Sequence, residues 1–383
     1  MNNIKEDSRP EEYHYYNQLK NHLWKSEVPL ESFVGGNSLF YPRQFEIHLP
    51  GNHKRACQLN CDHCAGKYFS KDLGHWEILG LELLDNLKGK IPFHIYGGAY
   101  TEPLLNPYYL TFLAMTKKYN NHFGIHTNGT LLNWLEKEQG WLTELNRLST
   151  DETDYLSVSI DAGTALSWGK SKGTKNFIQF TDILEGIRTA INIRKQAGKG
   201  HAIRLCYLIS PLADGQVDFE KITSFAKEVK VDSLRFSIPF APYNQAFKKV
   251  HDYKDSREIP GNTNYQKRLA PFLSKSMDER PYIFYTGPEF TDIDRYTFEK
   301  CYYFGYQITL GADGHFYKCS TVATPTAKQC RLGKATSSLN EFNAILNKNA
   351  DLSWNCQKMC FNKKLRCNRM GLEINSAIEE IKR

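Results

Sequence analysis

The sequence predicts an α/β fold, in which an open, partial (β/α)6 barrel of parallel strands precedes a small cysteine-rich C-terminal domain with a β-hairpin. Short apolar runs alternate with amphipathic helical patterns between residues 45 and 240. Polar or glycine-rich segments follow these runs, where the functional loops of a β/α barrel lie. A second group of cysteines then occupies residues 301–383.

Composition places the chain among ordinary globular proteins. Its 383 residues are enough for one large barrel and a smaller module, and 41% are hydrophobic and 24% charged. No apolar run reaches the ~18 residues of a membrane span, and the first residues lack the apolar core of a signal peptide. We therefore expect a cytoplasmic protein with no membrane partner, whose ten cysteines stay reduced or bind metal.

The formal net charge of +7 favours no particular macromolecular partner. No block of lysine and arginine is dense enough to indicate nucleic-acid binding, so no nucleic-acid partner is expected. A modestly positive surface is the simplest interpretation, and an acidic or phosphorylated substrate remains open.

Changes in composition divide the chain into consecutive parts. Residues 1–44 are polar and aromatic, and we interpret them as an N-terminal extension with a short helix at 11–25. Residues 45–240 form the barrel. Residues 241–300 connect it to the next domain and contribute to the wall of the substrate site. Residues 301–383 form the cysteine-rich domain.

The predicted strands are short and apolar, and the segments between them show helical spacing. The strands are 45–49, 93–96, 123–126, 155–160, 203–209 and 234–238. Two helices are predicted most clearly, from apolar residues three or four apart at 177–191 and at 219–229. Strands alternating with helices imply parallel pairing with right-handed crossovers.

A group of three cysteines follows the first strand, with the spacing C-x3-C-x2-C: Cys57, Cys61 and Cys64. A structural zinc site normally takes four protein ligands, and a ferredoxin-type run supplies a fourth cysteine nearby. Here the next cysteine is Cys206. Three thiolates on a four-iron cluster would leave one iron open to a substrate or cofactor, whereas zinc-binding or metal-free thiols are the alternative.

Polar or glycine-rich residues also follow the other strands. They are Gly97–Pro103, Thr127–Thr130, Ser159–Asp161, Ser210–Pro211 and Ser237–Pro239. Because the carboxyl ends of parallel strands meet at one edge of a barrel, we expect these segments to surround the cysteine loop.

With this cysteine spacing after a first strand, the chain resembles the radical SAM superfamily over roughly residues 45–370. The resemblance implies a partial TIM barrel and a [4Fe-4S] cluster whose open iron binds S-adenosylmethionine (SAM). It implies that one electron cleaves SAM to a 5'-deoxyadenosyl radical, which removes hydrogen from a substrate. It also implies an external one-electron reductant of the flavodoxin or ferredoxin type.

The resemblance extends to individual residues. Gly97-Gly98 matches the glycines that receive the methionine amino group of SAM, although Glu102 stands later than the glutamate of the family. Arg204 lies within the fifth strand: pointing inward it would clamp the methionine carboxylate, and pointing outward it would be a solvated charge. The implied SAM-binding residues are His63, Gly97, Gly98, Glu102, Asn128, Ser159, Asp161 and Arg204.

Cys206 has two interpretations. It can be a small buried hydrophobic residue, or a thiol that donates hydrogen to a substrate radical, as in radical SAM epimerases. Cys330 lies outside the cysteine spacing described next, and it can be a ligand, a hydrogen donor or neither. Both thiols are therefore candidate catalytic residues.

The C-terminal cysteines begin with Cys301, Gly314 and Cys319 in the spacing C-x12-G-x4-C. The segment 308–318 reads as a β-hairpin with Asp313-Gly314 as its turn. This stretch resembles the start of the SPASM or twitch extension, which houses auxiliary [4Fe-4S] clusters.

The end of the chain departs from that pattern, because Cys356-x3-Cys360-x6-Cys367 is followed by no further cysteine. Two fully ligated clusters would need more thiolates than the chain offers here. One auxiliary cluster, held by Cys301, Cys319 and two of the last three cysteines, is the economical interpretation. Two clusters, at least one of them incompletely ligated, and a zinc site are the alternatives.

The sequence therefore predicts a radical SAM enzyme that abstracts hydrogen from an unactivated C–H bond. We expect a peptide substrate, modified by crosslinking, epimerisation or dehydrogenation. Oxidation or rearrangement of a small molecule, such as a sugar or an aminocyclitol, is the first alternative. A non-catalytic iron–sulfur or zinc-binding protein is the second.

Overall fold

A computed structural model describes most of the chain. The described residues are 41–52, 54–61, 64, 73–98, 100–210, 212–237, 265–276, 278–286, 307–325 and 327–350. The predicted helix at 11–25, His63, Cys301 and the last three cysteines lie outside them.

The described strands form one sheet in the order β10-β9-β8-β1-β2-β3-β4-β5-β6-β7. All six predicted strands are present, and they pair in parallel in the order of the sequence. They are β1 (Gln44–His48), β2 (Phe93–Gly97), β3 (His122–Thr127), β4 (Tyr155–Ser159), β5 (Ala202–Leu208) and β6 (Ser233–Ser237). The predicted α/β fold with a parallel sheet core is therefore confirmed.

Two features of the sheet go beyond the prediction. A further strand, β7 (Tyr282–Thr286), pairs in parallel with β6. The predicted hairpin is present as β8 (Gln307–Leu310) and β9 (His315–Tyr317), but β8 pairs in parallel with β1 and so extends the barrel sheet. β10 (Arg331–Lys334) completes this edge next to β9.

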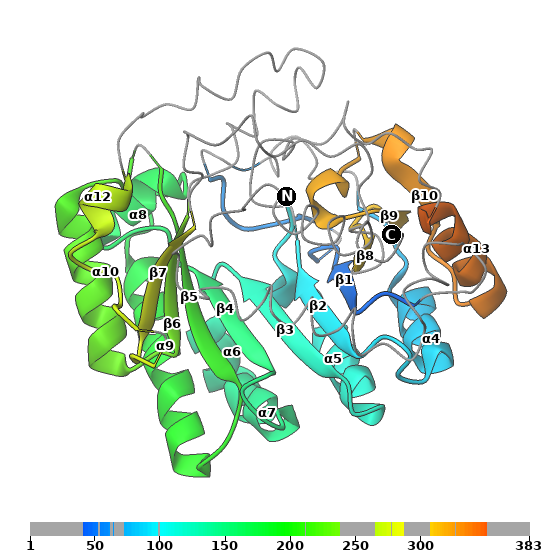
Figure 1. Ribbon diagram of the computed structural model, residues 1–383, viewed down its shortest axis with the longest axis horizontal. Helices are drawn as coiled ribbons and strands as arrows, with labels where there is room; N and C mark the ends of the chain where they lie inside the picture. Colours follow the sequence, from blue (N-terminus) through cyan, green and yellow to red (C-terminus); the bar gives the residue numbers. More distant parts are fainter. Residues whose placement is uncertain are drawn as a thin grey trace, which may run out of the picture.

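Helices cover the outer face of the curved row of strands (Figure 1). The predicted helices at 177–191 and 219–229 are confirmed as α9 and α10. The α-helices are α4 (Glu77–Leu87), α5 (Tyr109–Lys118), α6 (Leu132–Gln139), α7 (Trp141–Leu148), α8 (Ala165–Ser171), α9 (Ile178–Ala197), α10 (Gln216–Val229), α12 (Tyr265–Leu269) and α13 (Leu339–Ala350). The short 3₁₀ helices are Pro103–Leu105, Ser320–Val322 and Lys328–Cys330.

Glycine and capping residues set the ends of these helices. α9 ends at Gly198, which has a left-handed φ of 66° that glycine adopts without strain. α8 begins where the Thr164 side chain accepts a hydrogen bond from the Ser167 backbone N–H. The apolar faces of the helices then pack on the sheet.

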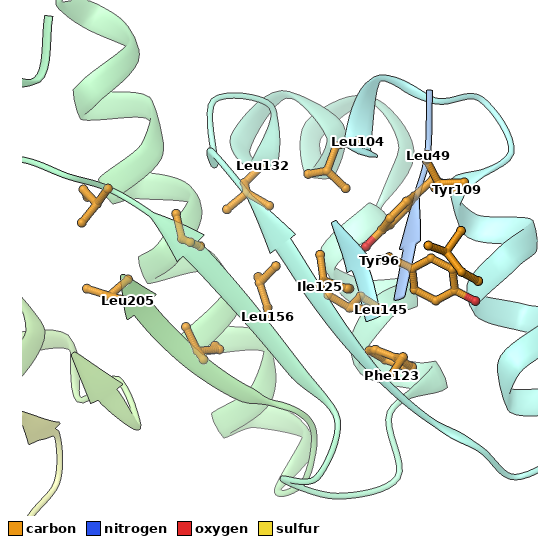
Figure 2. Close-up of a cluster of buried hydrophobic side chains, with 14 of the residues drawn as sticks. Leu49, Tyr96, Leu104, Tyr109, Phe123, Ile125, Leu132, Leu145, Leu156 and Leu205 are labelled. Atoms are coloured by element: carbon orange, nitrogen blue, oxygen red, sulfur yellow. The ribbon is translucent and has the colours of Figure 1, made fainter. Parts of the chain in front are cut away.

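The main hydrophobic core lies between the sheet and these helices. Figure 2 shows part of it, in which Ile125 and Leu156 of the sheet lie near Leu132 of α6 and Leu145 of α7. Alternate residues of each strand face this core, as the two-residue period of a strand requires. On β5, Ile203, Leu205 and Tyr207 belong to the core, so Arg204 and Cys206 face the interior of the barrel. The interior face of the sheet therefore carries charged side chains such as Arg204 next to the apolar cluster of Phe93, Ile95, Tyr155 and Ala202.

No helix in the described part of the chain has the length and apolar character that crossing a membrane requires.

Asp154 joins the starts of several strands at the edge opposite the cysteine loop. Its carboxylate accepts hydrogen bonds from the Phe123 and Thr150 N–H groups, each at 2.9 Å, and from Lys117 Nζ at 2.9 Å. Its backbone carbonyl accepts from the Ala202 N–H at 2.8 Å. Burial raises the pKa of Asp154, but hydrogen bonds from His122 and Lys117 outweigh it and lower the pKa to about 2.

Asp154→Asn should therefore remove a pH-dependent part of the stability. The pKa of an unfolded aspartate is about 3.9, so the ionised Asp154 stabilises the fold above that pH and this contribution is lost as the pH falls toward 2. We expect the difference in free energy of unfolding between the wild type and the Asp154→Asn variant to be about 1 kcal/mol smaller at about pH 3 than at about pH 5. Urea unfolding at a series of pH values measures this difference, and a pH-independent difference would contradict the assignment.

Candidate functional site

The cysteine loop is fixed by backbone hydrogen bonds from two directions. The Glu102 N–H, in the loop after β2, donates to the Ala56 carbonyl at 2.8 Å. The Asn60 N–H donates to the Lys172 carbonyl, at the end of α8, at 3.1 Å. Within the loop, the Cys64 N–H donates to the Cys61 carbonyl at 3.2 Å. The loop therefore lies at the C-terminal edge of the parallel strands, where the sequence predicts it.

Cys57 receives two hydrogen bonds at its sulfur. Asn128 Nδ2 lies 3.5 Å from Cys57 Sγ, and the Leu59 N–H donates to the same sulfur at 3.4 Å. Burial and the charge of the Glu102 carboxylate raise the pKa of the Cys57 thiol to about 12. N–H donors directed at a sulfur stabilise it as a metal-bound thiolate.

All three cysteines of the loop are partly buried and close enough to interact electrostatically. The charges of Cys61 and Cys64 both act on Cys57. Among the described residues, no three His, Cys, Asp or Glu side chains are arranged to hold a single metal ion. The donor set of three thiols on one loop, with N–H groups directed at one sulfur, fits a cluster that binds thiolates at separate irons.

Asn128 connects the cysteine loop to the end of β3. Its Oδ1 accepts from Gln58 Nε2 at 3.2 Å and from the Thr130 hydroxyl at 2.7 Å. Gln58 Nε2 also donates to the Thr130 hydroxyl. These contacts orient the Asn128 amide so that its NH2 group faces Cys57. The structure thus brings Asn128, a predicted site residue, to the cysteine loop, together with Thr130 of the same predicted segment and Gln58, which the sequence does not single out.

Glu102 lies at the site, but its carboxylate is hydrogen-bonded to other groups of the protein. Oε1 accepts from the Thr127 hydroxyl at 2.6 Å and from the Leu104 N–H at 3.2 Å, and Oε2 accepts from the Asn128 N–H at 2.8 Å. Burial raises the pKa of Glu102 to about 7, although the bonds from Asn128 and Thr127 oppose it. In this arrangement Glu102 holds the loops after β2 and β3 together.

Gly97 and Gly98 end β2 beside this network. A Cβ on Gly98 would lie 2.6 Å from the Thr101 carbonyl oxygen, too close for any side chain. A Cβ on Gly97 would lie 3.3 Å from the Cβ of His126, which a small shift relieves. The turn at Gly98 therefore requires glycine, and its backbone is left open to a ligand.

Lys172 is a buried cation that the sequence analysis does not identify. Its Nζ donates to the Asp161 carboxylate and to the Ser159 carbonyl, the latter at 3.1 Å. Burial lowers the pKa of Lys172, but the charges of Asp161 and Cys61 outweigh burial and hold the pKa above its ordinary value. Asp161 also accepts from the Leu208 N–H at 2.7 Å. The predicted residues Ser159 and Asp161 are thus joined to the cysteine loop through Lys172.

Two predicted residues of β5 face the barrel interior. Arg204 stacks over the Tyr155 ring at 4.1 Å, so its side chain points inward, which the sequence leaves undecided. Cys206 is buried, and its Sγ lies 3.1 Å from Ser157 Oγ. Both lie on the wall below the cysteine loop.

The described C-terminal cysteines are close to each other in one small cluster. Cys330 is buried with Tyr317, Val322 and Ala323, and the partly buried Cys319 packs against the same cluster. The structure brings these two thiols to one region and does not test the other auxiliary ligands.

Comparison with known proteins gives only distant similarities. No family model and no curated protein matches the chain. Among solved structures, it is similar to SuiB from Streptococcus suis bound to S-adenosylmethionine, with 12% identity, a TM-score of 0.48 and coverage of 79% of this chain and 62% of SuiB. It therefore spans less than two thirds of SuiB.

Two further structures show similarity at the same level. One is anSMEcpe with bound AdoMet and Cp18Cys peptide, with 13% identity, a TM-score of 0.44 and coverage of 88% of this chain and 96% of that one. The other is coproporphyrinogen III oxidase (HemN) from Escherichia coli, a radical SAM enzyme, with 14% identity, a TM-score of 0.39 and coverage of 63% and 55%. At these values the similarities by themselves assign neither a family nor a function.

Proposed function

We propose that this protein is a radical SAM enzyme. One observation carries the proposal: the loop of three cysteines lies at the carboxyl edge of parallel strands, beside the open turn at Gly98 and in contact with Asn128. This is where a β/α barrel binds its ligands. The sequence resemblance, which rests on the same residues, agrees with it.

In the proposed mechanism, Cys57, Cys61 and Cys64 would hold a [4Fe-4S] cluster. Once reduced, the cluster would supply the electron for cleavage of SAM and so for removal of a hydrogen atom from the substrate. The chain positions the reactants: the Gly98 turn offers backbone groups to the methionine part of SAM, while Asn128 holds Cys57 in place. Lys172 neutralises negative charge next to Cys57 and Cys61. The buried walls exclude water from the reaction.

The proposed role of the remaining residues follows the sequence resemblance. By this resemblance, Asn128 and Ser159 would contact the methionine and ribose parts of SAM, with Asp161 at the same strand end as Ser159, and His63 would lie by the adenine. Cys301, Cys319 and two of Cys356, Cys360 and Cys367 hold an auxiliary cluster in a SPASM-like domain at 301–383. We place the enzyme in the cytoplasm, supplied by a flavodoxin- or ferredoxin-type reductant.

We propose a peptide as the substrate, because the C-terminal extension resembles that of peptide-modifying enzymes. A small molecule such as a sugar or aminocyclitol is the alternative. A short precursor-peptide gene beside the gene for this chain would support a peptide. Co-expression of that peptide with the enzyme should then change its mass, and an unchanged mass would favour a small molecule.

The test of the proposed function is the cleavage of SAM. The chain is reconstituted with iron and sulfide without oxygen, reduced with dithionite, and incubated with SAM. Liquid chromatography with mass spectrometry should detect 5'-deoxyadenosine and methionine, which unreduced protein should not form. Protein that has incorporated iron and yet forms no 5'-deoxyadenosine would be a non-catalytic iron–sulfur protein.

Gly98→Ala should weaken SAM binding at least about tenfold, because the new methyl group collides with the Thr101 carbonyl and distorts the turn. Gly97→Ala is the matched control: it adds the same methyl group against the Cβ of His126, and we expect a change below about threefold. Equilibrium dialysis of the reconstituted proteins measures both affinities. Equal effects of the two substitutions would show that the Gly98 turn has no special role.

A further inference from the structure

Two arginines lie side by side on the interior wall of the barrel. In the pairing of β5 with β6, Arg204 is opposite Ser233 and Cys206 is opposite Arg235. Leu234 and Phe236 of β6 belong to the helix-covered core, so Arg235 faces the interior, as Arg204 does. Strand spacing and rise place their Cα atoms about 8 Å apart. Two long side chains at this separation can reach one ligand.

Aromatic residues hold this part of the wall in place. The Arg204 guanidinium lies 4.1 Å from the centre of the Tyr155 ring, and the Tyr155 hydroxyl is 2.9 Å from His126 Nε2. A Cβ on Gly124 would collide with the Tyr155 ring, so the glycine in β3 makes room for it. Tyr155 therefore fixes Arg204 on the wall without neutralising its charge.

Three other partly buried arginines of the described residues, unlike these two, lie next to a carboxylate. Arg194, Arg268 and Arg331 each lie within ion-pair distance of an aspartate. Neither Arg204 nor Arg235 forms an ion pair within the described residues, and Arg235 Nε is buried without a hydrogen-bond partner there. Arginine stays charged at any ordinary pH. A partly buried guanidinium without an anion is less well solvated than in water, and an anionic ligand would offset this cost.

The nearby groups leave the wall positive. Burial lowers the pKa of His126 to about 4, with Arg235 and Arg204 adding to this and Glu46 opposing it, so the imidazole is neutral near pH 7. The Glu46 carboxylate is already hydrogen-bonded to His48 at 2.8 Å and to Gln307 at 2.6 Å. Among the described residues around His126, two guanidiniums thus face the interior with the carboxylate of Glu46, which has partners of its own.

This positive wall lies just below the proposed reaction site. His126 directly precedes Thr127 and Asn128, which reach the cysteine loop. Cys206, on the same wall, is paired with Ser159. A ligand held by the arginines would extend from the interior toward the carboxyl edge of the strands.

We propose that Arg204 and Arg235 bind a carboxylate group of the substrate. The proposal rests on the proposed function and narrows its substrate class to an acidic peptide, bound through an aspartate, a glutamate or the C-terminal carboxylate. A planar guanidinium matches a carboxylate with two parallel hydrogen bonds, and two of them can hold its oxygens from both sides. The methionine carboxylate of SAM offers the same chemistry, so the experiment must separate the two sources.

The test measures two affinities of the reconstituted full-length chain. SAM binding is followed by equilibrium dialysis. Binding of the probe N-acetyl-Glu-Glu-amide, with SAM present at saturation, is followed by ligand-observed NMR, and the neutral N-acetyl-Gln-Gln-amide is its control. The proteins are the wild type, Arg204→Gln, Arg235→Gln and Arg235→Lys. Arg188→Gln, on the outer helix α9, is the matched control.

We expect the wild type to bind the acidic probe at least tenfold more tightly than the neutral one. Arg204→Gln and Arg235→Gln should each weaken binding of the acidic probe at least tenfold, and Arg235→Gln should change SAM affinity less than twofold. Arg235→Lys should bind the acidic probe more tightly than Arg235→Gln does. Arg188→Gln should bind the acidic probe as tightly as the wild type. Recovery of binding by Arg235→Lys would show that the loss is an effect of charge and not of misfolding. Thermal melting of each variant detects a folding defect directly.

Two results would overturn the proposal. If the glutamine variants lose SAM affinity and keep the acidic probe, the arginines bind the carboxylate of SAM. If the wild type does not prefer the acidic probe, the wall is no carboxylate site, whatever the variants do. Both results are distinct from a failure of the proposed function, which would appear as absence of SAM cleavage in the wild type.

Discussion

Replacing Cys61 by alanine should reduce SAM cleavage at least about 1000-fold, to the level of a blank, and remove about four irons per chain. Cys61 is the middle cysteine of the loop, and its charge acts on both Cys57 and Lys172. Two remaining thiolates cannot hold a cluster that also keeps one iron open for SAM. Iron analysis and mass spectrometry of 5'-deoxyadenosine measure the two losses.

Cys206→Ala is the control for iron content, because Cys206 lies on the interior wall and contacts Ser157. It should retain all of the iron of the wild type. Irons bound by the C-terminal cysteines should remain in the Cys61 variant as well. Unchanged iron content and unchanged 5'-deoxyadenosine in the Cys61 variant would exclude this loop as the site of the cluster.

Replacing Lys172 by methionine should lower the free energy of unfolding by about 3–5 kcal/mol. The side chains of Lys172 and Asp161 are each only 3% exposed, so the substitution leaves the Asp161 carboxylate buried without its cation. Methionine has a similar length and fills most of the same space. Urea unfolding followed by circular dichroism, on proteins of equal iron content, measures the loss.

Two further variants separate the ion pair from other effects of the substitution. Lys170→Met, at an exposed position of the same helix, should change stability by less than about 0.5 kcal/mol. Adding Asp161→Asn to Lys172→Met should recover part of the loss, because no unpaired charge then remains buried. Strictly additive losses from the two substitutions would contradict a coupled pair.

The strands of the barrel could be predicted because their signal is local. Each of the six predicted strands is a short apolar run between polar segments, and the observed bounds differ by at most one residue at each end. The hairpin was equally clear from Asp313-Gly314, where Gly314 has a left-handed φ of 75°. Such signals depend only on neighbouring residues, so no tertiary information is needed to see them.

β7 and the position of β8 could not be predicted in this way. The run 282–286 follows a long polar stretch without a clear helical pattern, so nothing marks it as a barrel strand. The pairing of β8 with β1 joins residues that are 263 positions apart, such as Gln44 and Gln307. No periodicity in a sequence encodes a pairing over that separation.

The candidate site likewise contains residues that the sequence identifies and residues that it does not. Asn128 and the glycines were identified because they follow strands, and the structure places them beside the cysteine loop. Lys172 was not identified, because a lysine near the end of an amphipathic helix reads as a surface charge. The direction of Arg204 depends on which face of β5 the helices cover, and this is set by packing. Whether a charged side chain is buried depends on the packing of other segments around it, so the sequence alone does not reveal it.

The pairing of β1 with β8 also has a consequence for synthesis on the ribosome. β1 is the first described strand to be made, and its neighbour β8 follows 263 residues later. At roughly 5–20 residues per second, the ribosome needs about 15–50 s to make this stretch. During that time one side of β1 presents unpaired backbone N–H and C=O groups that another nascent chain can pair with. Chaperone protection in this interval would therefore matter more for this protein than the stability of its finished sheet suggests.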